Sequence, residues 1–142
     1  MSSASTTSSI ELSPPEAFAA IALTAVAADG VIQAEEAQII QTTLARMQLF
    51  KSYSEDAKRE MLDRLLGHIN QQGYDALLKA AIAKLPSELR ETAFAVATDI
   101  TLSDSDLAEE EENLLNDLYN SLEISEEMAT KIIDVLLIKN KG

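Results

Sequence analysis

Residues 29–36 read Asp-Gly-Val-Ile-Gln-Ala-Glu-Glu, and residues 104–111, 75 positions further on, read Asp-Ser-Asp-Leu-Ala-Glu-Glu-Glu. Each copy follows an apolar segment of helical periodicity and precedes a second, amphipathic segment. Each copy also holds an Asp and a Glu seven residues apart. The duplication predicts two similar helical halves with carboxylates at equivalent joints.

Composition favours an all-α fold in a single domain. Apolar residues make up 46% of the 142-residue chain, but aromatic residues only 4%, so the core must consist mainly of Ala, Leu, Ile and Val. Four glycines and three prolines are too few for a turn-rich β-sandwich or barrel. Helices are therefore the expected elements.

The periodicity predicts about seven helices. Ser13 is a natural N-cap, Pro14 suits the first helical position, and Glu16 completes a capping box. The Ser/Thr-rich residues 1–12 are expected to form a disordered tail, and residues 13–142 the helical domain. The expected helices span residues 14–28, 34–48, 54–72, 75–85, 86–102 and 109–122, with a seventh beginning after Ser125.

The duplication extends beyond the acidic residues. At the offset of 75, Ile40 pairs with Leu115, and Ile21 pairs with Val96. After the connector at 49–53 the offset becomes 71, and the expected core residues Met61 and Leu66 then match Ile132 and Leu137. We therefore expect two pseudo-symmetric three-helix repeats, joined by the fourth helix as a linker.

The charge balance restricts the partners. A net charge of −13, from 24 acidic and 11 basic residues, repels nucleic acid and anionic lipid headgroups but attracts metal cations or a basic protein surface. The absence of cysteine excludes disulfides and thiolate zinc sites. The chain shows no secretory signal and no apolar run long enough for membrane insertion, so a cytoplasmic protein is expected.

The sequence Ala28-Asp29-Gly30, followed by Ile32 and Glu36, resembles the signature of the tellurite-resistance TerB-like family. The second half is also similar, with Glu91-Thr92-Ala93-Phe94 and Asp99 leading into Asp104, Leu107 and Glu111. The resemblance covers residues 14 to about 140. It implies a non-enzymatic all-α domain of two helical repeats, a link to tellurite and stress resistance, and protein partners that are often membrane-bound.

The resemblance also implies metal ligands at the two joints. Residue by residue, these fall on Asp29, Glu36, Asp104 and Glu111. Oxygen ligands suit calcium, magnesium or manganese, and carboxylates also hold zinc. The chain departs from the family pattern at Ser105, where a glycine is typical. No EF-hand is present, because the twelfth positions counted from Asp29 and Asp104 are apolar.

Three of the four candidate ligands have a structural alternative. Glu36 and Glu111 lie near the third position of a helix, where a Glu accepts a hydrogen bond from the N-cap amide. Asp29 could equally accept backbone hydrogen bonds in a turn. The sequence contains a single histidine, His68, and no Ser/His/Asp set or phosphate-binding Gly loop, so no enzyme is expected.

Two functions follow from these observations. The first is a non-catalytic, acidic interaction module whose surface is tuned by a divalent metal or a protein partner. The alternative is an all-helical scaffold or oligomerisation domain with no bound ligand. Partner, metal and oligomeric state are left open by the sequence.

Overall fold

The computed structural model describes residues 10–25, 32–102 and 109–141, with side chains from residue 112 onward in the last range. Every regular element in these ranges is helical, which confirms the all-α class and the seven expected helices. The α-helices are α1 (Pro14–Thr24), α2 (Ala34–Ala45), α3 (Glu55–Gln72), α4 (Tyr74–Lys84), α5 (Arg90–Thr101), α6 (Glu109–Ser121) and α7 (Glu126–Lys139). Two 3-10 turns, η2 (Gln48–Phe50) and η3 (Ser87–Leu89), precede α3 and α5.

Helix α1 begins with the predicted capping box. The Glu16 N–H donates to Ser13 Oγ at 3.3 Å, and the Ser13 N–H donates to Glu16 Oε1 at 2.8 Å. Beyond this turn, every residue from 17 to 24 is buried. Four of these eight residues are alanines, whose short side chains let neighbouring helices approach closely. A helix without a solvent face belongs at the centre of a domain.

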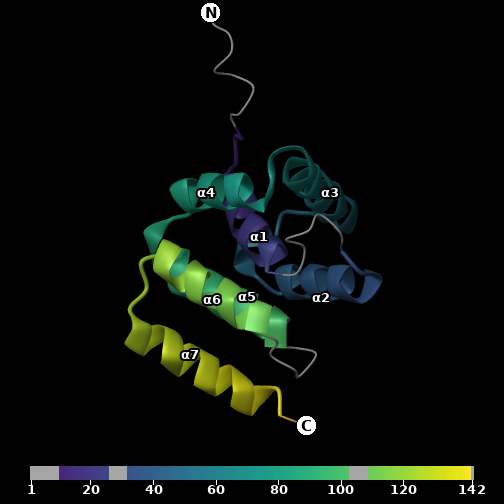
Figure 1. Ribbon diagram of the computed structural model, residues 1–142. Coiled ribbons are helices and arrows are strands. Elements are labelled where there is room, and N and C mark those ends of the chain that lie inside the picture. Colours follow the sequence, from purple (N-terminus) through teal and green to yellow (C-terminus); the bar gives the residue numbers. More distant parts are fainter. Residues whose placement is uncertain (1–9, 26–31, 103–108, 142) are drawn as a thin grey trace, which may run out of the picture.

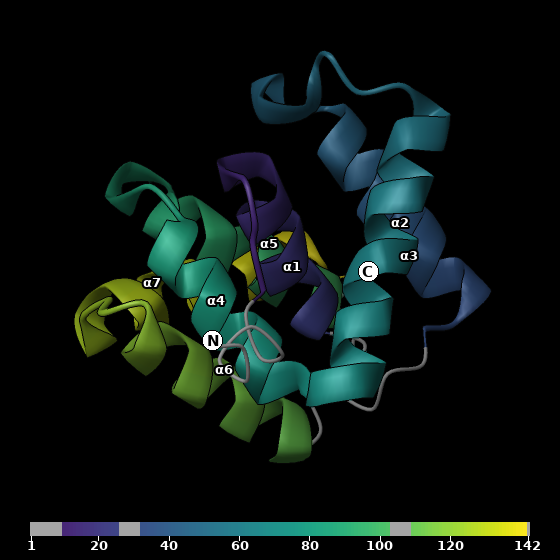
Figure 2. The ribbon, with the colours of Figure 1, turned by 90° about the horizontal axis from the view of Figure 1, so that it is seen from above.

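The other helices surround α1 (Figure 1). Helix α1 packs on α3, α4 and α5, and α4 also packs on α3. Helix α5 in turn packs on α6 and α7, so α7 lies at the periphery in both ribbon views (Figure 2). The largest buried side chains include Phe18 from α1, Phe50 from η2 and Phe94 from α5.

The core reaches further toward the N-terminus than the sequence suggested. Ile10 and Leu12 belong to the expected tail, yet only 9% and 8% of their surfaces are exposed, and both pack into the core. Apolar side chains on either side of Glu11 can both be buried if the chain runs along the core before the Ser13 cap. The packed chain therefore includes residues that precede the first helix.

Several helix boundaries differ from the expected ones. Helix α1 ends at Thr24, with Ala25 as its C-cap, and residues 26–28 of the expected helix lie outside the described chain. Helix α2 ends at Ala45 rather than Gln48, because η2 turns the chain so that Phe50 enters the core. There the Phe50 ring lies edge-on to Phe18, with centroids 6.4 Å apart.

Among the described helices, none combines the length and apolar character that a membrane crossing requires.

Candidate functional site

At the first joint, Glu36 has the structural role that its position predicted. Gln33 is the N-cap of α2 with an extended backbone, and its N–H donates to Glu36 Oε1 at 2.9 Å. This bond satisfies one of the amide donors that a helix leaves free at its start. Asp29, the other predicted ligand of this joint, lies outside the described residues. The first cation site therefore stays a prediction.

The second joint is described only by its backbone. Glu111 is the third residue of α6, as expected for a first-turn acid, but its side chain lies outside the described part of the chain, as does all of Asp104. Among the side chains that are described, no three acidic or histidine groups converge as they would around a cation. Three of the four predicted ligands are not among them, so the prediction at Asp104 and Glu111 also stands as a prediction.

Asp99, which the sequence places one turn before the second joint, binds the end of α7. Its Oδ1 accepts a hydrogen bond from Asn140 Nδ2 at 2.8 Å and forms an ion pair with Lys139 Nζ at 3.3 Å. Asn140 also donates to the Leu136 carbonyl, which closes the last turn of α7. Asp99 therefore fastens the end of α7 to α5.

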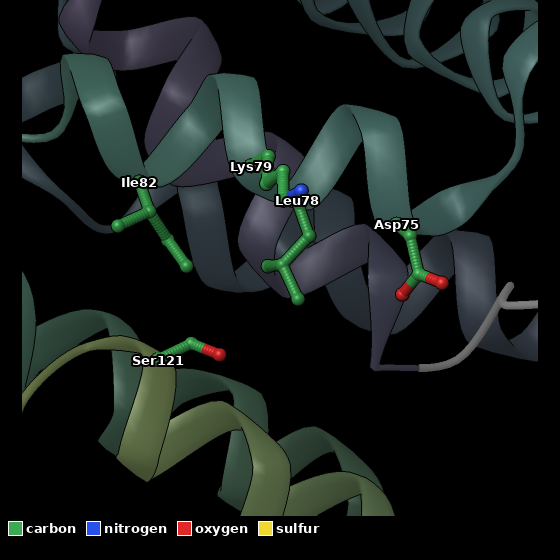
Figure 3. Close-up of a pocket in the computed structure, with 5 residues that line it drawn as sticks. All are labelled: Asp75, Leu78, Lys79, Ile82 and Ser121. Atoms are coloured by element: carbon green, nitrogen blue, oxygen red, sulfur yellow. The ribbon is translucent and has the colours of Figure 1, made fainter.

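A groove that sequence reasoning missed lies between α4 and α6. It encloses about 500 Å³ and is lined by Asp75, Leu78, Lys79 and Ile82 from α4 and by Ser121 from α6. Figure 3 shows Leu78 and Ile82 extending from α4 toward Ser121, with Asp75 nearer the start of α4. Asp75, Leu78 and Ile82 follow the spacing i, i+3, i+7, which places them on one side of the helix. That spacing was visible in the sequence, but the opposing wall of α6 was not.

The groove carries negative charge at the end formed by the first turn of α4. The Asp75 carboxylate, burial and the Asp117 carboxylate, in that order, raise the pKa of the Tyr74 phenol above its ordinary value. Asp117 of α6 therefore lies close enough to the start of α4 to act on it, and it precedes Ser121 by one helical turn. In the sequence, residues 109–121 hold five acidic residues and no basic one. Lys79 is the one cation among the lining residues.

A second surface, on α7, is apolar and open to solvent. Val135 is 62% exposed, Ile138 is 74% exposed and Leu137 is 46% exposed. The sequence paired Leu137 with Leu66 as a core position, whereas nearly half of its surface is in water. The cause is the peripheral place of α7, which packs chiefly on α5 through Ala129 and its half-buried neighbours.

The basic cluster at the start of α3 is internally neutralised. Lys58 is 3% exposed and pairs with Glu55 at 3.0 Å, and Arg59 pairs with Asp56 at 3.1 Å. Arg64 reaches Glu16 of α1 at 2.8 Å. Each of these three basic side chains is therefore paired with a carboxylate, which argues against a basic docking patch at this end of α3.

Comparison with known proteins gives no relative. No protein-family model matches the chain, and no curated protein and no solved structure matches it either. The resemblance to TerB-like domains therefore rests on the residues quoted for it.

Proposed function

We propose that this protein is a non-catalytic interaction module whose groove between α4 and α6 binds a basic amphipathic helix of a protein partner. The observation that carries the proposal is the groove itself, in which Leu78 and Ile82 of α4 lie beside the carboxylate of Asp75. An amphipathic helix that enters a groove places its apolar face on the floor and its charged residues at the rim.

The charges favour a basic occupant over an acidic or neutral one. The chain carries a net charge of −13, and α6 alone holds five acidic residues and no basic one. Complementary charge speeds the encounter and selects the partner, while burial of apolar side chains supplies affinity. The occupant should therefore combine leucine-like side chains with flanking lysines or arginines.

A synthetic peptide tests this function directly. The probe is a helical leucine/lysine peptide of about 14 residues, or about four turns, labelled for fluorescence anisotropy. We expect Asp75→Lys and Ile82→Asp to weaken its binding about tenfold each. Asp56→Lys makes the same charge change at an exposed site in the first turn of α3, outside the groove, and should have little effect. Equal loss in Asp56→Lys and Asp75→Lys would mean attraction by net charge alone, and the groove would not be the site.

The family resemblance adds cation binding at Asp29, Glu36, Asp104 and Glu111 to the proposed function. Thermal melting with calcium, magnesium, manganese or zinc measures it, because an ion that binds only the folded state raises the melting temperature. The rise should be absent in the double variant Asp29→Asn/Asp104→Asn. Glu36→Gln is a sharper control, since its amide oxygen can still accept the bond from the Gln33 N–H. Identical melting of the wild type with and without these ions would rule out a tight site.

The two-repeat organisation is also part of the proposal. Helix α1 contacts α2 and α3, α5 contacts α6 and α7, and α1 and α5 pack on each other. Ile40 and Leu115, which the offset of 75 pairs, are 0% and 1% exposed. These contacts support two related three-helix units with α4 as the linker. The family resemblance adds a role in stress or tellurite resistance to the proposal, and the sequence adds a cytoplasmic location.

The second candidate function is an oligomerisation scaffold. The exposed Val135 and Ile138, which share one side of α7, favour it, because large apolar side chains that gather on one surface commonly mark a contact with another chain. Sedimentation of the pure protein over a range of concentrations tests the scaffold function. A monomer at every concentration would leave only the module that binds other proteins.

A further inference from the structure

Helix α7 presents a stripe of one cation and two apolar residues to solvent. Lys131, Val135 and Ile138 follow the spacing i, i+4, i+7, so they lie along one side of the helix. All three are exposed, Val135 by 62% and Ile138 by 74%. We call these residues the α7 stripe. Its inward neighbours, including the buried Ala129, hold the helix on α5.

The α4 side of the groove presents the complementary order. Asp75, Leu78 and Ile82, the α4 stripe, run acid, apolar, apolar along the chain, whereas the α7 stripe runs base, apolar, apolar. Leu78 is 8% exposed, so only a small part of its side chain lines the groove, and Ile82 is half-buried. Both stripes span seven residues, or about 10 Å of helix. When the helices lie parallel, Lys131 faces Asp75 and the apolar pairs coincide.

We propose that the groove between α4 and α6 accepts α7 of a second copy of this chain. The inference rests on the proposed function of the groove and names its occupant. In the contact, Lys131 of one copy pairs with Asp75 of the other, Val135 packs on Leu78, and Ile138 packs on Ile82. Helix α7 keeps its place on α5, so no segment is exchanged between the copies.

Charge supports α7 as the occupant. Two copies with a net charge of −13 repel one another over most of their surfaces. Residues 126–141 are different, because three lysines balance three acidic residues there. At physiological salt, charges further apart than about 8 Å are largely screened. The lining of the groove holds one acid, Asp75, and one base, Lys79, so the charge-balanced α7 meets less repulsion there than an acidic face of the chain would.

Sedimentation of the full chain tests the apolar part of the contact. We expect the wild type to associate as its concentration rises, and Val135→Gln/Ile138→Gln to weaken association about tenfold or more. Both residues are exposed, so the folded monomer should survive, and a helical circular dichroism spectrum checks this. Leu137→Gln is the matched control. It lies about 200° around the helix from Val135 and should leave association unchanged.

A charge exchange tests the pairing of the two surfaces. Asp75→Lys and Lys131→Asp should each weaken association, and the double variant should recover most of it, since the pair is restored with reversed sign. An equimolar mixture of Asp75→Lys with Val135→Gln/Ile138→Gln should associate more strongly than either protein alone. In the mixture, the intact α7 stripe of Asp75→Lys can bind the intact groove of Val135→Gln/Ile138→Gln.

Three results would overturn the inference. A wild type that stays monomeric excludes the contact. If Asp75→Lys still associates but Val135→Gln/Ile138→Gln does not, α7 pairs with another α7 instead. Loss of association in Leu137→Gln places the contact on the other side of the helix. In each case the leucine/lysine peptide still reports on the groove, so failure of this inference is distinguishable from failure of the proposed function.

Discussion

Asn140 Nδ2 donates a hydrogen bond of 2.8 Å to Asp99 Oδ1, which joins residues 41 positions apart at the ends of α7 and α5. The same carboxylate oxygen accepts Lys139 Nζ at 3.3 Å. Because α7 packs chiefly on α5, this pair of contacts determines how firmly the last turn of α7 is held.

Replacement of Asp99 by Ala should loosen the last turn of α7. Both contacts disappear, and we expect a loss of about 1 kcal/mol in the free energy of unfolding, since the site is partly exposed and water screens the charge. Amide hydrogen exchange at residues 136–140 should accelerate more than exchange in α3. Asn140→Ala should reproduce most of the effect, whereas Lys139→Ala should reproduce little. Uniform acceleration across the domain would contradict a local role.

The Glu16 side chain makes two stabilising contacts. Its Oε1 accepts the Ser13 N–H of the capping box, and its Oε2 accepts Arg64 of α3 at 2.8 Å. Glu16→Ala should therefore lower the free energy of unfolding by about 1–2 kcal/mol. Arg64→Ala should cost less, because the cap remains. Urea unfolding of both single variants and the double variant measures the coupling, and strict additivity would mean that the ion pair contributes nothing.

Enlargement of a side chain within α1 should be poorly tolerated. Ala20 is 0% exposed in a helix that packs against four others, so Ala20→Leu must displace neighbours and should cost about 1–3 kcal/mol. Ala83→Leu on the exposed side of α4 adds the same atoms in open solvent and should be nearly neutral. Thermal unfolding compares the two. A neutral Ala20→Leu would show that α1 is packed more loosely than its burial indicates.

The Tyr74 phenol should titrate above its ordinary pKa of about 10. Asp75, burial and Asp117 all disfavour the phenolate, so the folded state holds the proton more tightly than the unfolded chain. This contribution to stability is complete below the unfolded pKa and is lost as pH rises through the folded pKa. Ultraviolet absorbance titration should show the Tyr74 pKa falling in Asp75→Asn and, by less, in Asp117→Asn. An unchanged value in Asp117→Asn would mean that α6 lies further from α4.

Local signals in the sequence predicted the starts of helices well. Ser13, Ser54 and Ser125 each accept a backbone N–H three residues on, at 3.0–3.3 Å, and each precedes a helix that the periodicity indicated. Such caps depend only on neighbouring residues. The end of α2 could not be predicted in the same way, since it is fixed by the distant contact of Phe50 with Phe18.

In the candidate site, too, a contact between neighbouring residues could be predicted, whereas the arrangement of distant helices could not. Glu36 was expected at the third position of its helix, and its bond to the Gln33 N–H confirms the structural alternative for that residue. The groove was not predicted, because its lining residues on α4 and α6 lie at least 39 positions apart in the chain and no local pattern records their distance in space. The exposure of Leu137 was missed for a similar reason. Periodicity marks a residue as apolar but does not show whether another helix covers it.

The burial of α1 has a consequence for how the chain can be divided. Residues 17–24 have no face toward water, and their cover comes from α3 and α4 on one side and α5 on the other. A fragment that ends at Leu85 would expose to water the side of α1 that faces α5. A fragment that begins at Arg90 would lack α1, on which α5 packs. Despite the internal likeness of its sequence, the chain should therefore melt in one cooperative transition, with neither half stable as an independent folding unit.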